Sequence, residues 1–238
     1  MGVFLAVPTL SAEISAWRQG YRHVAGVDEV GRGPLAGPVV AGAVILEPSG
    51  ARAWWSELRD SKLLAAPERE RLAAQIRSEC AWGIGAASHE LIDALGLTAA
   101  TKLAMRRAVE ALPCRPDMLL IDAVSLPEYR HRAIIHGDAL CASIAAGSII
   151  AKVARDAMME EYHPQYPAYG FNAHRGYATP EHLRALDEHG PCAIHRRLFA
   201  PVRTALAARG MAVAGAADAI EIGTDGDADA AEMEAALA

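Results

Sequence analysis

The sequence of 238 residues has few cysteines, few lysines and no long apolar run. Its four cysteines are scattered and form no C-x-x-C pair, and His163, His174 and His195 are spread through polar loops with no H-x-x-x-H spacing. A disulfide framework or a zinc site is therefore not expected, and a reducing cytoplasm is the natural location. No stretch approaches the roughly 18 uninterrupted apolar residues that a membrane span needs, so no membrane association is expected.

The charge is unevenly distributed along the chain. The formal net charge is -6, yet residues 203–238 alone contain seven acidic and two basic side chains. The rest of the chain is nearly neutral, which neither indicates nor excludes a nucleic-acid partner, because local clustering of charge matters more than its sum. The Ala-rich acidic segment has little to bury. We expect residues 1–202 to form one catalytic domain and residues 203–238 to be a mobile tail.

Apolar periodicity and turn residues predict an α/β fold. Strands are expected at 23–30, 39–46, 80–88, 118–122 and 133–136, and helices at 10–19, 67–79, 98–112, 143–162 and 180–189. The first three strands can form an antiparallel meander, because a short turn joins the first two. The runs at 118–122 and 133–136 are short and almost wholly apolar, which is typical of buried parallel strands. Together they indicate a mixed sheet.

Acidic residues follow the apolar strands. Asp28 and Glu29 end the first strand, Asp122 ends the run 118–122, and Asp138 follows the next strand. Consecutive strand residues point to opposite faces, so Asp28 and Glu29 can share a site only if one acts at the strand's end or through its neighbouring carbonyl. Taken alone, that pair also fits a solvated strand end. However, an acid that ends a buried strand costs desolvation energy unless a partner such as a divalent cation compensates.

Four carboxylates at the ends of adjacent strands suit Mg²⁺ or Mn²⁺, which prefer oxygen ligands. The usual chemistry of such a site is in-line displacement at phosphorus. The glycine turn at 31–38 supports a phosphate or sugar ligand, because Gly31 and Gly33 let backbone N–H groups approach closely and Arg32 adds a cation. A dinucleotide fingerprint is rejected, since prolines and a β-branched run follow the turn where that motif needs a helix.

Several separate stretches, in the same order, resemble the bacterial ribonuclease HII (type 2 ribonuclease H) family. They are residues 26–40, 60–63, 121–123, 137–139, 142–156, 169–170 and 174–179. The resemblance implies an RNase H-like fold, with a five-stranded mixed sheet flanked by helices and with C-terminal helices. It implies an endoribonuclease that cuts the RNA strand of RNA/DNA hybrids and single ribonucleotides embedded in duplex DNA, leaving 3′-hydroxyl and 5′-phosphate ends. The resemblance therefore also implies a role in DNA replication and repair.

The resemblance also implies roles for single residues. Asp28, Glu29 and Asp122 would bind the Mg²⁺ or Mn²⁺ ions, with Asp138 as the fourth active-site acid. The turn Gly31-Arg32-Gly33 would read the ribose 2′-hydroxyl, and Tyr177 would contact the ribonucleotide or the next sugar. The 2′-hydroxyl is the one group that distinguishes this target from plain DNA.

Three positions and the assembly leave alternatives open. Ser61 and Lys62 are candidate contacts to the phosphate backbone, or else part of a plain helix cap after Asp60. His136 stands where the family often has Lys, and is either a phosphate contact or a hydrogen-bonded spacer. A monomer is the default expectation, and the sequence does not reveal a protein partner.

Two other functions are compatible with the same fold. One is a module that binds hybrids without cutting them, against which the presence of all four acids argues. The other is a different RNase H-like nuclease, such as a resolvase or a transposase core. The glycine turn and Tyr177 argue against that alternative, because such enzymes need no 2′-hydroxyl sensor.

Overall fold

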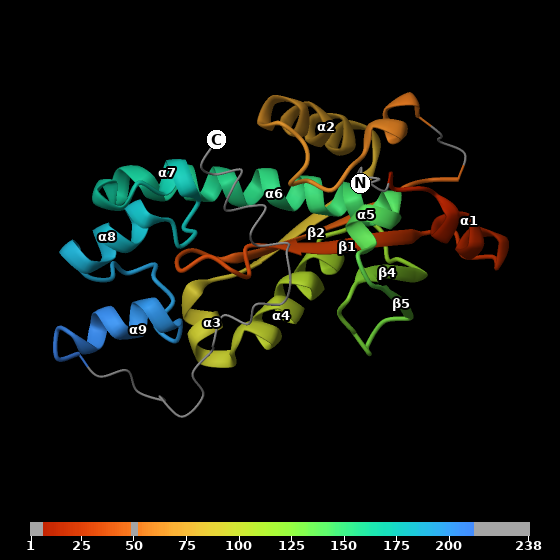
Figure 1. The fold of residues 1–238 in the computed structure, drawn as a ribbon. Helices are drawn as coiled ribbons and strands as arrows, with labels where there is room; N and C mark the ends of the chain where they lie inside the picture. The colour runs from red at the N-terminus through yellow and green to blue at the C-terminus, as the bar shows by residue number, and fades with distance from the viewer. Residues whose placement is uncertain (1–6, 49–51, 212–238) are drawn as a thin grey trace, which may run out of the picture. The chain divides into compact units, whose positions relative to one another are not determined.

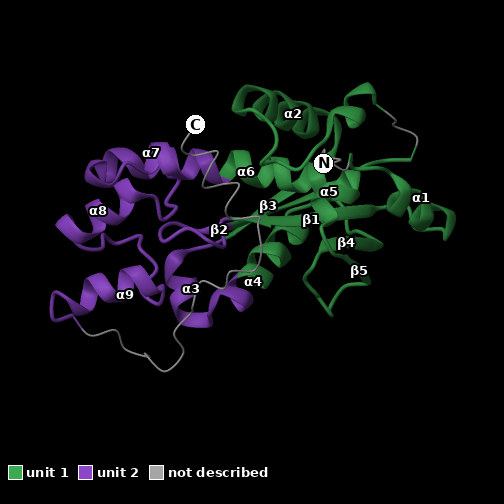
Figure 2. Ribbon diagram, in the orientation of Figure 1, with its two compact units in different colours: residues 1–30, 40–86, 101–154 green, residues 31–39, 87–100, 155–238 purple. Residues whose placement is uncertain are grey.

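The computed structural model describes residues 7–48 and 52–211. The chain forms two compact units (Figure 2). Unit 1 comprises the described residues of 1–30, 40–86 and 101–154, and unit 2 those of 31–39, 87–100 and 155–238. Neither unit is a continuous stretch of sequence, because the chain passes between them several times.

The sheet has five strands in the order β3-β2-β1-β4-β5 (Figure 1). They are β1 Val24–Val30, β2 Val39–Ile45, β3 Ala81–Ala87, β4 Met118–Asp122 and β5 His131–Ile134. Strand β1 pairs antiparallel with β2 and parallel with β4, and β4 pairs parallel with β5. The predicted five-stranded mixed sheet is therefore confirmed.

The described helices are mostly those that the sequence predicts. The longer ones are α1 Ser11–Arg18, α2 Ala66–Glu79, α4 Leu97–Glu110, α6 Ala142–Tyr162 and α8 Pro180–His189. Shorter elements that the periodicity did not reveal are α3 His89–Leu95, α5 Gly137–Leu140, α7 Phe171–His174, α9 Ala200–Ala207 and the 3-10 turns Ala53–Glu57, His163–Gln165 and Pro167–Tyr169.

The last strand differs from its prediction. The sequence predicts a buried strand at 133–136, but β5 spans His131–Ile134 and is partly exposed along its length. It forms the outer edge of the sheet, and Ile135, just beyond it, is 71% exposed. An edge strand has a neighbour on one side only, so its apolar run is not enclosed as that of β4 is.

Glycines bring α6 close to the sheet within unit 1. A Cβ added at Gly26 of β1 would lie 2.1 Å from the backbone carbon of Ser143, and one at Gly42 of β2 would lie 2.2 Å from the carbonyl oxygen of Gly147. No side chain fits at these contacts, so the helix rests directly on the strand backbones. This packing positions α6 behind β1, the strand that carries the first acid.

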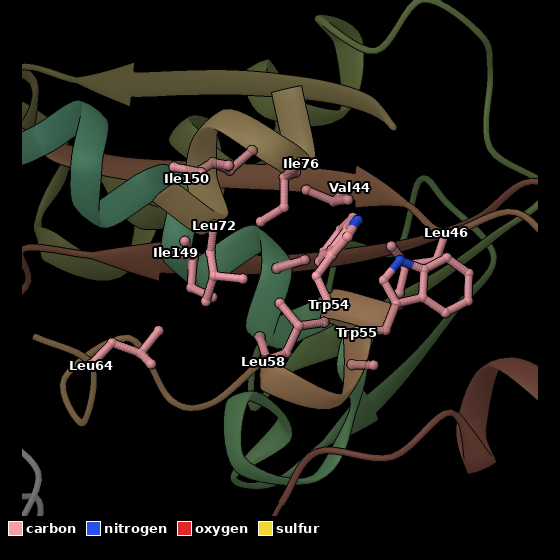
Figure 3. Packing of buried hydrophobic residues seen from close by; sticks show 14 residues of the cluster. Val44, Leu46, Trp54, Trp55, Leu58, Leu64, Leu72, Ile76, Ile149 and Ile150 are labelled. Atoms are coloured by element: carbon pink, nitrogen blue, oxygen red, sulfur yellow. The ribbon is translucent and has the colours of Figure 1, made fainter. Parts of the chain in front are cut away.

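The main apolar cluster of unit 1 lies on the same side of the sheet (Figure 3). Leu72 and Ile76, four residues apart on α2, pack with Ile149 and Ile150 of α6, and Trp54 closes the cluster from the 3-10 turn before α2. Burying side chains of this size stabilises the fold by roughly 1.5–3 kcal/mol each. The cluster therefore holds α2 and the first part of α6 firmly in place.

Unit 2 has its own small core around Phe171. This ring stacks on Tyr169, with 5.4 Å between ring centroids, and packs with Met159, Ala185 and Ile194. Helix α8 begins at a side-chain cap, since the Thr179 hydroxyl accepts the N–H of His182. The core fixes the segment between α7 and α8, which includes Tyr177.

Helix α9 crosses the predicted boundary between domain and tail at residue 202. It buries Val202, Ala205 and Leu206, which explains why helix continues past that point. The remainder of the predicted tail, 212–238, lies outside the described residues, so the mobile tail stays a prediction. Within the described part of the chain, no helix combines the length and apolarity that a membrane span requires.

Candidate active site

The register of two parallel strands brings Asp28 and Asp122 side by side. Strands β1 and β4 pair from Val24 opposite Met118 to Val27 opposite Ile121. The next residue on each strand is an acid, and neighbouring strands lie roughly 4.8 Å apart. Two acids more than ninety positions apart in the sequence therefore follow the paired stretch of adjacent strands in unit 1. Asp122 ends β4, whereas β1 continues beyond Asp28 to Val30.

Asp28 is buried among like charges. Only 5% of it is exposed, and its pKa is raised well above the usual value of 3.8, first by burial and then by the charges of Glu29, Asp138 and Asp122. A hydrogen bond from the Ser148 side chain opposes this rise. Ser148 comes from α6, so the close packing of that helix on β1 also supplies the polar partner of this carboxylate.

Asp122 is joined to the segment that carries Asp138. Its Oδ1 accepts the backbone N–H of Gly137 at 3.0 Å, and Asp138 lies in the first turn of the short helix α5. The chain turns sharply here, since both Ala123 and His136 have left-handed backbones, with φ of 45° and 56°. These turns bring α5 back to the end of β4.

The pKa values of both these acids are raised. For Asp122 the main cause is burial, which the Gly137 N–H opposes. For Asp138, burial and the charges of Asp60 and Asp122 raise the pKa to about 6. Mutual repulsion between the acids is what a bound cation would relieve.

Glu29 does not lie at the strand's end. The pairing of β1 with β2 continues past it, through Glu29 opposite Ala41 to Val30 opposite Val40. Strand alternation therefore directs Asp28 and Glu29 toward opposite faces. The charge of Glu29 is nevertheless the second cause of the raised pKa of Asp28.

Asp60 is an acid that the sequence reasoning did not select. Its charge raises the pKa of both Asp122 and Asp138, while that of Lys62 lowers both. Asp60 also caps a turn, because its Oδ1 accepts the Lys62 N–H at 3.0 Å and its carbonyl accepts the N–H of Leu63. Asp60 could have been found from the sequence, because it begins the stretch 60–63, from which only Ser61 and Lys62 were selected as candidate site residues. The helix cap predicted as the alternative is wrong, because α2 begins only at Ala66, after Ala65, and Asp60 closes a turn before it. Lys62 lies near the acids.

The burial of Ser61 argues against the predicted phosphate contact by its side chain. The residue is 1% exposed, and its Oγ lies 3.0 Å from the Oγ of Ser148. A hydroxyl enclosed in this way does not reach a phosphate on the surface. Instead, Ser61 supports Ser148, which in turn supports Asp28.

The donor set of unit 1 fits a hard divalent cation in its chemistry. Buried or half-buried carboxylates that raise one another's pKa are the ligands that Mg²⁺ and Mn²⁺ prefer. Among residues 7–48 and 52–211, however, no three His, Cys, Asp or Glu side chains are arranged to hold an ion as they stand. The assignment of Asp28, Glu29 and Asp122 as metal ligands therefore stays a prediction.

The glycine turn and Tyr177 belong to unit 2. Gly31 has a φ of 90°, a backbone conformation that favours glycine, while Arg32 is exposed and Gly33 half-buried. The N–H of Leu35 donates to the carbonyl of Gly176 at 2.8 Å, which joins the turn to the segment that carries Tyr177. Tyr177 itself is buried.

Histidines support the Tyr177 segment. His174 and His195, which the sequence places in polar loops, are both buried, together with His182. The rings of His174 and His182 stack with 4.6 Å between centroids, and His182 Nδ1 lies 2.7 Å from the Tyr177 carbonyl oxygen. The loops are thus packed around this cluster of histidines. The polarity of the sequence alone did not predict that these histidines are buried.

Comparison with known proteins agrees with this arrangement of motifs. The family model described as Ribonuclease HII matches residues 25–202. A protein named Ribonuclease HII from Dehalococcoides mccartyi is 47% identical over 200 residues, covering 83% of this chain and 95% of that protein. One of the same name from Burkholderia thailandensis is 55% identical over 185 residues, covering 76% of this chain and 85% of its own length.

Solved structures show the same fold. The crystal structure of the ribonuclease H2 from Pyrococcus horikoshii is 26% identical and superposes with a TM-score of 0.66, covering 76% of this chain and 96% of that one. The Archaeoglobus fulgidus RNase HII, solved in a complex with PCNA, is also 26% identical, with a TM-score of 0.61 over 73% of this chain and 93% of that one. Both similarities support an RNase H-like fold.

Proposed function

Because this chain belongs to the ribonuclease HII family and is an endoribonuclease of RNA/DNA hybrids, we propose that it also cuts duplex DNA at single embedded ribonucleotides. The family is dependent on divalent metal ions. We propose that two such ions, Mg²⁺ or Mn²⁺, act in hydrolysis and that the products carry 3′-hydroxyl and 5′-phosphate ends. The observation that carries the proposal is the pair of acids Asp28 of β1 and Asp122 at the end of the neighbouring β4, with α5 hydrogen-bonded to Asp122.

The acids of unit 1 form the proposed catalytic centre. Asp28 and Asp122 would hold the cations with their side chains, and Asp138 would lie beside them as the fourth acid. Glu29, whose side chain strand alternation directs to the opposite face, would contribute to the same site through its neighbouring carbonyl. The chemistry that bound cations supply is activation of the attacking water and neutralisation of charge on the leaving 3′-oxygen. The environment of Asp28 favours this role. The Ser148 hydroxyl donates a hydrogen bond to its carboxylate, and a bound cation would relieve the repulsion from the neighbouring acids.

Lys62 is proposed to contact the substrate backbone. Its ammonium acts on the pKa of both Asp122 and Asp138, so it lies within electrostatic range of the reacting centre. A cation there would favour a phosphodiester over a neutral ligand. It would also reduce repulsion between the phosphate and the acids.

Recognition of the ribonucleotide is proposed for unit 2. Backbone N–H groups of Gly31-Arg32-Gly33 would bond the 2′-hydroxyl, because side-chain-free positions let the backbone approach a sugar closely. The Tyr177 ring would contact the same nucleotide or the sugar that follows. The direct Leu35–Gly176 hydrogen bond supports a joint role for the two segments.

One assay tests the proposal. Three labelled duplexes are incubated with the full chain and Mg²⁺ or Mn²⁺: an RNA/DNA hybrid, a DNA duplex with one ribonucleotide, and an all-DNA duplex of the same sequence. We expect cleavage of the first two and not of the third. Ligation and phosphatase treatment of the products then identify the ends.

The other outcomes identify the alternatives. Binding of the hybrid without cleavage under either metal would show a module that does not cut. Equal cleavage of the all-DNA duplex would show a nuclease without a 2′-hydroxyl sensor, such as a resolvase. Cleavage of the hybrid alone would refute the proposed activity on single ribonucleotides.

A further inference from the structure

A buried arginine of unit 2 is bonded to the backbone of the glycine turn. Arg196 is fully buried, and its guanidinium donates to the carbonyl oxygens of Gly31 at 2.6 Å and Arg32 at 2.7 Å. It also donates to those of Gly37 at 3.0 Å and Pro38 at 3.2 Å. One side chain thus binds both ends of the turn.

This arrangement is costly if its only purpose is stability. Burial, and the nearby charge of Arg155, lower the pKa of Arg196 well below its usual range. Removing a charge from water costs several kcal/mol before its hydrogen bonds compensate, and apolar residues often stabilise a core as well. A buried cation bonded to four carbonyls fixes the direction of those carbonyls, which apolar residues do not do.

The direction of the carbonyls determines that of the amides. In a planar trans peptide, the N–H of one residue points opposite to the carbonyl of the residue before it. The Gly31 and Arg32 carbonyls point toward the buried guanidinium, so the N–H groups of Arg32 and Gly33 point away from it. Arg32 is exposed and Gly33 half-buried, so this direction leads toward the surface of unit 2.

A second buried arginine provides the comparison. Arg155 is also fully buried, and it donates to the carbonyls of Pro38 at 3.0 Å and Ala36 at 3.3 Å, and to that of Arg175 at 3.1 Å. These are carbonyls of the later part of the turn and of the Tyr177 segment. The Gly31 and Arg32 carbonyls are bonded by Arg196.

We propose that Arg196 is a positioning residue for ribose recognition: it holds the Gly31 and Arg32 carbonyls inward, so that the Arg32 and Gly33 amides face the 2′-hydroxyl of the substrate. This proposal rests on the proposed function of the turn. It assigns the specificity of the turn to a residue more than 160 positions away in the sequence, which does not itself touch the substrate.

The test compares Arg196→Lys with Arg155→Lys. A lysine keeps the charge, but its single ammonium does not reproduce a planar fork that reaches several carbonyls at once. Each full-length variant is first checked for folding by circular dichroism and thermal unfolding. Binding to a duplex with one ribonucleotide and to its all-DNA counterpart is then measured by fluorescence anisotropy in EDTA, and the ratio of the two affinities is the readout.

For Arg196→Lys, we expect the affinity ratio to fall by about five- to tenfold, the effect of misaligning one hydrogen bond. Arg155→Lys should weaken folding to a similar degree but keep the ratio within about twofold, because it leaves the Gly31 and Arg32 carbonyls held. A purely structural role would lower the stability of both variants and change neither ratio. A folded Arg196→Lys variant that keeps the wild-type ratio overturns the proposal, and so does an equal loss in Arg155→Lys.

A milder variant covers the case in which Arg196→Lys does not fold. The Asp93 carboxylate accepts the N–H groups of Arg197 at 3.0 Å and Leu198 at 3.3 Å, so it anchors the segment that carries Arg196. Asp93→Ala should lower the affinity ratio in the same direction by about twofold or more, and an unchanged ratio overturns the proposal. If the wild-type chain itself does not distinguish the two duplexes, it is the proposed function of the turn that fails.

Discussion

The carboxylate of Asp122 accepts the backbone N–H of Gly137, with 3.0 Å between Oδ1 and N. The bond joins the end of a buried strand to the first residue of a short helix, fifteen positions later in the chain. Asp138 is the next residue, so the same contact determines where the fourth acid lies. The position of Asp138 thus depends directly on Asp122, the other acid proposed for this part of the site.

Asp28→Asn should abolish cleavage and at the same time stabilise the metal-free protein. Asp28 is buried and repelled by three other acids, so removing its charge relieves an unfavourable interaction. Cleavage activity should fall by more than ~100-fold, which exceeds the loss expected when a residue that only orients a metal ligand is removed. Cleavage of the single-ribonucleotide duplex and thermal unfolding in EDTA measure the two effects.

The metal provides the control for this substitution. Adding Mg²⁺ should raise the Tm of the wild-type protein, because a ligand that binds only the folded state stabilises it. It should raise that of Asp28→Asn much less. Undiminished activity, or an equal metal-induced shift in both proteins, would contradict the assignment of Asp28 to the metal site.

Ser148→Ala should reduce activity through Asp28. The Ser148 side chain bonds Asp28 and lies 3.0 Å from the Ser61 hydroxyl, and both serines are buried. Losing the group that orients the carboxylate should lower kcat about ten- to hundredfold. Steady-state kinetics on the hybrid measure the change.

The matched control is Ser61→Ala. It removes the outer hydroxyl but leaves the bond between Ser148 and Asp28, so stability should fall by about 1 kcal/mol with little change in kcat. Equal losses of kcat in the two variants would show that the serines act only through packing. A raised KM in Ser61→Ala would instead support the predicted contact between Ser61 and a substrate phosphate, against which the burial of the hydroxyl argues.

Local patterns were enough to predict β1, β4 and the acids that follow their apolar runs. A carboxylate directly after a buried apolar run can be recognised in the sequence, as at Asp28 and Asp122. That β1 continues past Asp28 to Val30 could not be recognised in this way, because it depends on pairing with β2. The edge position of β5 has no such signal. Which strand lies outermost depends on pairing between distant segments, and the run 133–136 reads the same in either place.

Helix α3 was missed although its signals were present. Ser88 caps its first turn by accepting the Leu91 N–H, and Gly96 follows its end with a φ of 80°. With only Gly96 between them, α3 and α4 look like one irregular stretch. The bonds of Arg196 could not have been predicted, since their acceptors are backbone carbonyls, which every residue type has.

Gly31→Ala should destabilise the protein more than Gly20→Ala. Both glycines have a φ near 90°, which costs an alanine about 1–2 kcal/mol. At Gly20 nothing lies within 4 Å of the added Cβ, whereas at Gly31 it would lie 2.1 Å from Nε of Arg155. The second substitution therefore adds the displacement of a buried guanidinium to the backbone strain.

Urea unfolding of the two variants measures this difference. The affinity ratio for ribonucleotide over all-DNA duplex should also fall in Gly31→Ala and remain unchanged in Gly20→Ala. Equal losses of stability would show that Arg155 moves aside without cost. Such a result would mean that the glycine turn is held less rigidly than its hydrogen bonds indicate.

Stability should decrease as the pH falls below about 6.5, because of the buried pair His182 and His195. Their Nε2 atoms lie 3.0 Å apart, His195 Nδ1 accepts the Cys192 N–H, and His182 Nδ1 lies beside a carbonyl oxygen. One ring nitrogen of each histidine must therefore accept a hydrogen bond, which requires both rings to be neutral. Burial, together with the neighbouring histidines, lowers the pKa of each ring to about 3.

The unfolded chain takes up these protons near pH 6.5, while the folded protein does not until about pH 3. The stabilisation that the pair contributes to folding is complete above pH 6.5. It is lost as the pH falls toward 3, by up to about 1.4 kcal/mol per pH unit for each ring.

Urea unfolding between pH 8 and pH 5 should show this pH dependence of the free energy of unfolding in the wild-type protein. His195→Gln should be less stable at pH 8 but lose less stability on acidification, whereas His23→Gln, at an exposed position, should keep the wild-type slope. Identical slopes in all three proteins would show that the buried pair does not govern acid sensitivity.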